Sequence, residues 1–189
     1  MTTVLLLVRH AESDVRAGSD RARGLTANGR ADARRLTEQL RQTPIDAVVS
    51  SPYARAVLTV QGIADERGLP VLPVEDLRER RLHGTDRLLP RAAFLEAVER
   101  SFADPDASLP GGESYREAQR RGAQAVRGLL DRFAGKTVAV GTHGNLLSMI
   151  LQAWDARYDY AFWQSLTMPD VYRAEFKADS LLGVERLWT

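Results

Sequence analysis

The segment Val4-Leu5-Leu6-Leu7-Val8-Arg9-His10 carries most of the information about the architecture of this chain. Its apolar part has the length of a strand and is apolar on both alternating faces, which is typical of a strand buried within a parallel sheet. The same run is too short to cross a bilayer. Two polar residues, Arg9 and His10, follow directly, so they lie where the predicted strand ends.

Segments of strand and helix length alternate on the C-terminal side of this strand. Ala47–Val49 and Thr137–Gly141 are short and apolar, and a further strand is expected near Val71–Val74. The tail predicts a closing hairpin around Asp179-Ser180. Its two strands are Val171–Phe176 and Leu182–Leu187.

Helices are predicted between these strands. The first is expected within residues 24–41 with Thr26 as its N-cap, and the second has Pro52 in its first turn and Gly68 as its stop. A third is expected over 92–102 and a fourth over 114–135, where Ser114 and Glu117 have the spacing of a capping box. A fifth helix follows His143. Strands that alternate with helices predict an α/β fold. We expect a three-layer α/β/α sandwich whose central sheet is mostly parallel with an antiparallel edge, and one domain over residues 1–189.

Composition narrows the class of protein. The 189 residues are 44% hydrophobic and 27% charged, as in an ordinary folded domain. The net charge is only +1, whereas a non-specific nucleic-acid binder usually has a larger basic excess. The chain has no cysteine, which excludes disulfides, thiolate metal sites and cysteine nucleophiles. Without a signal-peptide pattern or a spanning segment, a cytoplasmic protein with neither nucleic-acid nor membrane partners is expected.

Three polar segments follow predicted strands and meet at one edge of the sheet. They are Arg9-His10, Ser50–Arg55 and His143–Asn145. Ligands of open α/β sheets bind beyond the carboxyl ends of the strands. The predicted fold therefore gathers two histidines that are 133 positions apart, together with two arginines.

These residue types suit phosphoryl transfer. Neutral imidazole is a nucleophile near neutral pH, and two guanidinium groups can hold phosphoryl oxygens by paired hydrogen bonds. Backbone N–H groups at the helix starts after Pro52 and His143 are expected to add anion affinity. A second, protonated histidine would stabilise charge on the equatorial oxygens. The pattern thus predicts a phosphohistidine intermediate.

A proton donor for the leaving oxygen is also needed. Glu79 is the best available carboxyl, with Glu75 and Asp76 as alternatives from the same charged run. His83 is given no catalytic role. The spacings of the three histidines match no zinc signature, so no metal site is predicted.

Six motifs resemble those of the histidine phosphatase superfamily, also called phosphoglycerate mutase-like, and they occur in the family's order. The motifs are Leu5–Ser13, Leu25–Gly29, Ser50–Ala56 with Thr59, Leu77–Glu79, Pro110–Ser114 and Val140–Asn145. The resemblance implies the phosphoglycerate mutase-like sandwich and the phosphatase branch. It also implies a site without metal or cofactor that acts on a small phosphorylated substrate.

The resemblance assigns roles to the residues that match its motifs. His10 would be the phosphorylated nucleophile, and Glu79 the acid that protonates the leaving group and then activates water. The residues expected to bind the substrate are Arg9, Ser13, Arg16, Arg55, His143, Gly144 and Asn145. The chain departs from the family pattern at three positions, because Ala11 replaces a glycine, Arg16 replaces an asparagine, and His83 stands where a glycine is common.

The leading hypothesis is a metal-independent phosphomonoesterase that hydrolyses a small phosphorylated metabolite. A cofactor-dependent phosphoglycerate mutase stays open, because His143-Gly144-Asn145 occurs there too. A phosphoanion-binding protein without turnover is a third alternative. Four arginines could bind a second anionic group but are more simply explained as surface residues: Arg16, Arg21, Arg23 and Arg87. The sequence leaves a monomer or a homodimer open.

Overall fold

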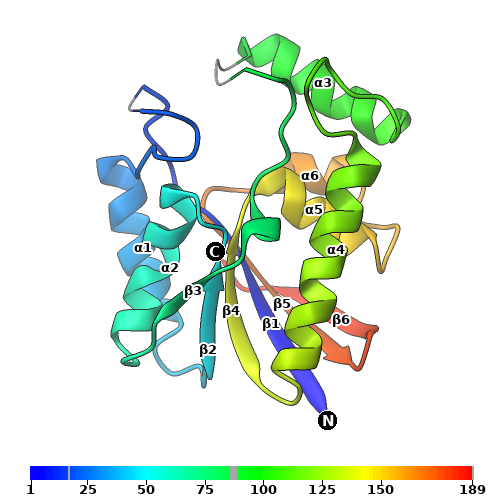
Figure 1. The fold of residues 1–189 in the computed structure, drawn as a ribbon. Coiled ribbons are helices and arrows are strands. Elements are labelled where there is room, and N and C mark those ends of the chain that lie inside the picture. The colour runs from blue at the N-terminus through cyan, green and yellow to red at the C-terminus, as the bar shows by residue number, and fades with distance from the viewer. Residues whose placement is uncertain (17, 86–88, 189) are drawn as a thin grey trace.

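The computed structural model describes residues 1–16, 18–85 and 89–188, which form a mixed six-stranded sheet of order β3-β2-β4-β1-β5-β6 (Figure 1). The strands are β1 (Thr2–Arg9), β2 (Ala47–Ser50), β3 (Val71–Pro73), β4 (Thr137–Thr142), β5 (Asp170–Lys177) and β6 (Ser180–Arg186). β3, β2, β4 and β1 are parallel, whereas β5 and β6 run antiparallel at one edge. The prediction of a mostly parallel sheet closed by an antiparallel hairpin is confirmed.

The helices also lie close to their predicted positions. They are α1 (Ala27–Gln39), α2 (Ala54–Asp65), α3 (Arg91–Ala103), α4 (Tyr115–Arg132), α5 (Gly144–Gln152) and α6 (Tyr160–Ser165), with one 3₁₀ turn, η1 (Glu75–Leu77). The sequence did not predict α6 or η1, since both are too short to show a helical repeat.

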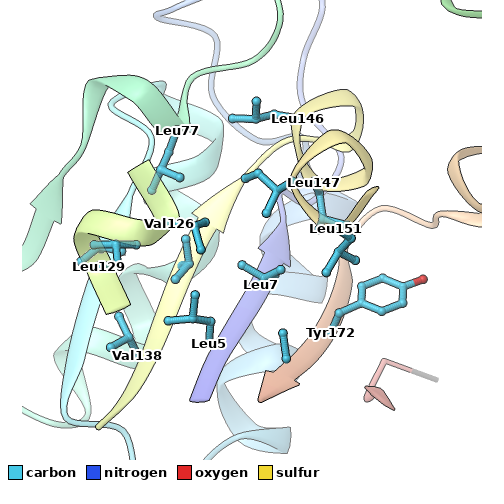
Figure 2. Packing of buried hydrophobic residues seen from close by; sticks show 14 of the residues in the cluster. Leu5, Leu7, Leu77, Val126, Leu129, Val138, Leu146, Leu147, Leu151 and Tyr172 are labelled. Carbon is cyan, nitrogen blue, oxygen red and sulfur yellow. The ribbon is translucent and has the colours of Figure 1, made fainter. Parts of the chain in front are cut away.

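Each face of the sheet buries its own core. Leu6 and Val8 of β1 point to one face, where Leu36 of α1 and Ile63 of α2 pack against them. Leu5 and Leu7 point to the other face, against residues of α4 and α5 such as Val126 and Leu147 (Figure 2). Truncating a buried leucine of this kind to alanine typically costs about 2–5 kcal/mol. The two cores confirm the three layers, with β1 in the middle.

Local signals explain where the helices begin. The side chain of Thr26 accepts a hydrogen bond from the Gly29 N–H, and Ser114 forms the predicted capping box with Glu117. The prediction for Pro52 is wrong, because α2 begins two residues later with Tyr53 as its N-cap. Tyr53 is extended, and its N–H donates to the Ser51 side chain at 3.3 Å. This turn keeps Ser51 and Tyr53 outside the helix.

The segment between β3 and α4 lies over the carboxyl ends of the parallel strands. Figure 1 shows α3 standing beyond the ends of β1 and β4, on the side where α5 begins. A cleft is lined both by residues of this segment, such as Phe94, and by His10 at the end of β1. In the part of the chain that the structure describes, no helix is long and apolar enough to cross a membrane.

Candidate active site

The register of the parallel strands brings the two histidines together. Arg9 of β1 is opposite Thr142 of β4, so His10 and His143 leave the sheet side by side. The N–H of His10 donates to the carbonyl of Thr142 at 3.0 Å, and the two ring centroids are 5.2 Å apart. Ser51 follows the neighbouring strand β2, and its N–H donates to the Gly141 carbonyl at 2.8 Å. The convergence that the sequence predicted is thus present.

A cleft of about 890 Å³ opens above these strand ends. Its volume lies in the range of roughly 300–1,000 Å³ that is usual for small-molecule sites. The predicted site residues that line it are Arg9, His10, Ser13, Arg55, Glu79, Gly144 and Asn145. His143 lies buried behind His10, and Arg16 is exposed and outside the lining. The structure therefore brings all the predicted residues together except Arg16.

His10 is held as a neutral ring with one defined tautomer. Its Nδ1 lies 2.8 Å from the carbonyl oxygen of Ala11, which can only accept, so Nδ1 carries the proton. Its Nε2 therefore has a free lone pair, which accepts a hydrogen bond from Arg55 Nε at 3.2 Å. Burial first, and then the charge of Arg55, keeps the pKa of His10 well below its usual value. His10 is thus a neutral imidazole whose Nε2 lone pair faces a guanidinium group.

Two buried or partly buried arginines line the cleft together with His10. Arg55 is 1% exposed, and its guanidinium contacts Asp20 and lies 5.0 Å from the centre of the Tyr53 ring. Arg9 donates to the Leu166 carbonyl at 2.9 Å, and its buried Nε has no partner among the described residues. Both groups keep donors that an incoming phosphoryl oxygen can accept from.

Gly144 makes room for Arg9. A Cβ atom at position 144 would lie 2.9 Å from Arg9 Nε and 3.0 Å from its Cζ. Any side chain would therefore push the guanidinium away from the strand ends. The glycine after His143 is explained by this close approach.

His143 does not carry the positive charge that a protonated second histidine would supply. The ring is fully buried, and Nε2 lies 2.8 Å from the Ser51 hydroxyl oxygen. Burial first, and then the nearby cation of Arg55 and the His10 ring, lowers the pKa of His143 well below its usual value. The ring is therefore neutral near pH 7 and acts by hydrogen bonding rather than by charge.

Glu79 is held in place by backbone N–H groups, two of them at the start of α5. Its Oε1 accepts from the N–H groups of Arg80 at 2.9 Å and Leu146 at 3.1 Å, and Oε2 accepts from the Asn145 N–H at 3.2 Å. Burial raises the pKa of Glu79, although these hydrogen bonds and the charge of Arg55 oppose the rise. The N–H groups of Asn145 and Leu146 therefore bind the Glu79 carboxyl, so these two of the N–H groups expected to add anion affinity are engaged within the protein.

The alternative acids are already paired. Glu75 forms two hydrogen bonds with Arg21, at 2.9 and 2.8 Å, and this contact lowers the pKa of Glu75. Asp76 pairs with Arg78 at 3.2 Å. Glu75 is thus held in its ionised form, and Asp76 does not line the cleft, so the geometry favours Glu79.

Sequence reasoning missed part of the cationic lining. Arg80 is 5% exposed, its Nε donates to the Glu113 carbonyl at 3.0 Å, and its Nη1 has no partner among the described residues. Arg23 lines the cleft and pairs with Asp20 at 3.1 Å. His83 also lines the cleft, whereas Arg87 lies outside the described residues. Arg80 follows Glu79 directly, but its charged neighbours made the segment look like a solvated face.

Comparison with known proteins gives the family. The model of the histidine phosphatase superfamily (branch 1) matches residues 5–180. The chain is 31% identical over 211 residues to a 2,3-bisphosphoglycerate-dependent phosphoglycerate mutase of Brucella anthropi, covering 99% of this chain and 98% of that protein. It is also similar to the solved structure of YhfR from Bacillus stearothermophilus. The TM-score is 0.78 at 27% identity, with 95% of this chain and 94% of the other covered.

Some relatives are longer than this chain. A bifunctional protein of Mycobacterium tuberculosis is 31% identical over an alignment of 195 positions, which covers 96% of this chain and 52% of that protein. The chain thus spans about half the length of the mycobacterial relatives that it matches. The family match nevertheless covers both strand ends with their histidines and the loop that bears Glu79. The chain belongs to the histidine phosphatase superfamily.

Proposed function

We propose that this protein is a metal-independent phosphomonoesterase that hydrolyses a small phosphorylated metabolite through a phosphohistidine on His10. The observation that carries the proposal is the state of His10. Its Nδ1 proton is fixed on the Ala11 carbonyl, and its Nε2 lone pair faces the donors of Arg55. This is the arrangement that a nucleophile needs in front of an anion site.

In the first step, phosphoryl oxygens replace His10 as the acceptor of the Arg55 Nε–H. The Nε2 lone pair of His10 attacks phosphorus as the bond to the leaving oxygen breaks. Arg9, Arg55 and a His143 N–H stabilise the charge on the equatorial oxygens, and the protonated Glu79 gives its proton to the leaving alcohol. The products are the free alcohol, a phosphorylated His10 and an ionised Glu79.

In the second step, water attacks the phosphorus of phosphohistidine. The Glu79 carboxylate accepts a proton from this water, and the bond between phosphorus and Nε2 breaks. Inorganic phosphate leaves, His10 regains its lone pair, and Glu79 is protonated again. Arginine donors supply the charge neutralisation in both steps, so the scheme needs no divalent cation.

A phosphoglycerate mutase is the second candidate, because a mutase of Brucella anthropi aligns with 99% of the chain. In a mutase the phosphoryl group on His10 would return to the substrate skeleton before water reacts. Such an enzyme depends on priming by a bisphosphorylated compound.

The test is hydrolysis of p-nitrophenyl phosphate and of a panel of phosphorylated metabolites, without priming and with excess chelator. We expect phosphate release that chelator does not reduce and that His10→Ala abolishes. Activity only after addition of 2,3-bisphosphoglycerate would favour the mutase. Tight vanadate binding without turnover on any substrate would favour a binding protein and contradict the proposal.

A further inference from the structure

The hydrogen bonds around His143 end in an unsatisfied nitrogen. The N–H of Tyr53 donates to the Ser51 hydroxyl oxygen at 3.3 Å, and this oxygen lies 2.8 Å from His143 Nε2. The other ring nitrogen, Nδ1, is buried and has no partner among the described residues. Ser51 and His143 are both 0% exposed.

The proton count along this chain fixes the direction of each bond. A serine hydroxyl has one proton to donate and two lone pairs. The Ser51 oxygen already accepts from Tyr53, and His143 Nε2 is the one acceptor that the described contacts offer to its proton. A neutral His143 has a single N–H, and the lowered pKa of this ring keeps it neutral. If Nε2 accepts from Ser51, the ring proton is on Nδ1.

We propose that Ser51 is a positioning residue that fixes His143 as the tautomer with its proton on Nδ1, so that this N–H can donate to the transferred phosphoryl group. The inference rests on the proposed function, because it assigns the acceptor of the Nδ1 proton to a phosphoryl oxygen. The centroids of the His143 and His10 rings are 5.2 Å apart, and the two rings meet edge to face.

The arrangement favours the phosphorylated states over the empty enzyme. A buried N–H without an acceptor is destabilising, and an oxygen that arrives in the site removes this cost. The gain is largest where the oxygen carries most charge, as in the transition state. In the opposite tautomer, with the proton on Nε2, the Nδ1 lone pair would repel the phosphoryl oxygen. Ser51 therefore decides whether His143 helps or hinders the transfer.

Ser51→Ala is the test variant, and Ser50→Ala is its matched control. Ser50 is also 0% exposed, and its hydroxyl donates to the Ser51 carbonyl at 2.8 Å without contacting His143. Both variants remove one buried hydroxyl from the same segment. Ser51→Thr keeps the hydroxyl and should restore most of what Ser51→Ala loses, and thermal unfolding shows whether each variant is folded.

The kinetic readout is kcat/KM for p-nitrophenyl phosphate together with the affinity for vanadate. We expect Ser51→Ala to lower kcat/KM by at least about 10-fold and at most by the 10²–10³-fold that losing one oxyanion donor costs. Vanadate affinity should fall in parallel. Ser50→Ala should keep both kcat/KM and vanadate affinity within about 3-fold of the wild-type values, because it removes one hydrogen bond that does not involve His143.

The spectroscopic readout needs no turnover. The chain has only three histidines, so ¹⁵N-histidine labelling with His10→Ala and His83→Ala variants assigns the ring nitrogens. We expect a protonated Nδ1 and an unprotonated Nε2 for His143 in the free protein, with this population lost in Ser51→Ala. Addition of inorganic phosphate should shift the Nδ1 signal.

Two results would overturn the inference. One is a His143 with its proton on Nε2 in the folded wild type, and the other is equal kinetics for the two alanine variants. Failure of the proposed function is distinguishable, because turnover that survives His10→Ala would refute the phosphohistidine without moving the tautomer signal.

Discussion

Replacing Glu79 with glutamine removes the candidate acid while keeping most of its hydrogen bonds. Oε1 accepts from two N–H groups, those of Arg80 and Leu146, and the amide oxygen of glutamine can accept both. The amide nitrogen would then face the Asn145 N–H, which now donates to Oε2. This donor-to-donor contact should destabilise the protein by about 1–3 kcal/mol. A domain with a typical stability of about 5–15 kcal/mol stays folded, as thermal unfolding can verify.

The effect on activity should depend on the leaving group. A positioned general acid contributes about 10²–10⁴-fold, which corresponds to roughly 2.7–5.4 kcal/mol of transition-state stabilisation. For an alkyl phosphate, whose leaving oxygen needs the proton, Glu79→Gln should lower kcat/KM by this factor. For p-nitrophenyl phosphate the loss in kcat/KM should be far smaller, because p-nitrophenolate leaves without a proton. Equal losses for the two substrates would refute the assignment of the acid.

The pH dependence gives a second check on Glu79. Burial raises its pKa, so the acid form falls as pH rises through that value, and alkyl phosphate turnover should fall with it. The raised pKa also makes the free energy of unfolding larger at low pH, because the folded state binds the proton more tightly than the unfolded state. This contribution is present at low pH and is lost as pH rises from about 4.5 through the folded-state pKa. Both pH effects should disappear in Glu79→Gln.

Three further predictions concern the cations and the histidines. Arg55→Lys loses the guanidinium fork that contacts both His10 and Asp20, so kcat/KM should fall by at least about 10²-fold. Arg35→Lys, at an exposed position, is the control. Equal activity of the two variants would contradict the anion site. Excess chelator should leave turnover unchanged, and rescue by added Mg²⁺ or Zn²⁺ would refute the metal-free scheme. The pKa values of buried His10 and His143 lie below those of the unfolded chain. The free energy of unfolding, measured by urea titration, should therefore fall as pH drops below about 6.5, by up to ~1.4 kcal/mol per pH unit for each histidine. A free energy of unfolding that stays constant from pH 7 to 5 would contradict the burial of His10 and His143 as neutral rings.

The fold was predictable where local patterns determine it. The apolar runs, the Thr26 and Ser114 caps and the stops at Gly68 and Gly135 depend on near neighbours, and each is present. The convergence of His10 and His143 followed from the rule for parallel strands. Pro52 was placed wrongly, because the turn before α2 depends on the Ser51 side chain, which no helical pattern records.

The details of the site depended on contacts between distant segments. The three carboxyls at 75, 76 and 79 belong to one charged run, and contacts with distant segments separate them in the fold: Glu75 pairs with Arg21, whereas Glu79 accepts from the start of α5. The neutral state of His143 depends on burial, which the sequence does not give at a single position. Arg80 resembled a surface residue for the same reason. Sequence patterns thus predicted which residues gather, and the packing decided their protonation.

The central claim is that His10 Nε2 carries the phosphoryl group. The direct measurement is ³¹P NMR and mass spectrometry of protein quenched with alkali during turnover of a good phosphate ester. We predict an acid-labile phosphoryl group on His10 at Nε2, because Nδ1 is occupied by its hydrogen bond to Ala11. His143→Asn should retain that site of attachment, and His10→Ala should show no phosphoprotein. Turnover without any phosphohistidine, or a phosphoryl group on Nδ1 or on another residue, would contradict this description of the site.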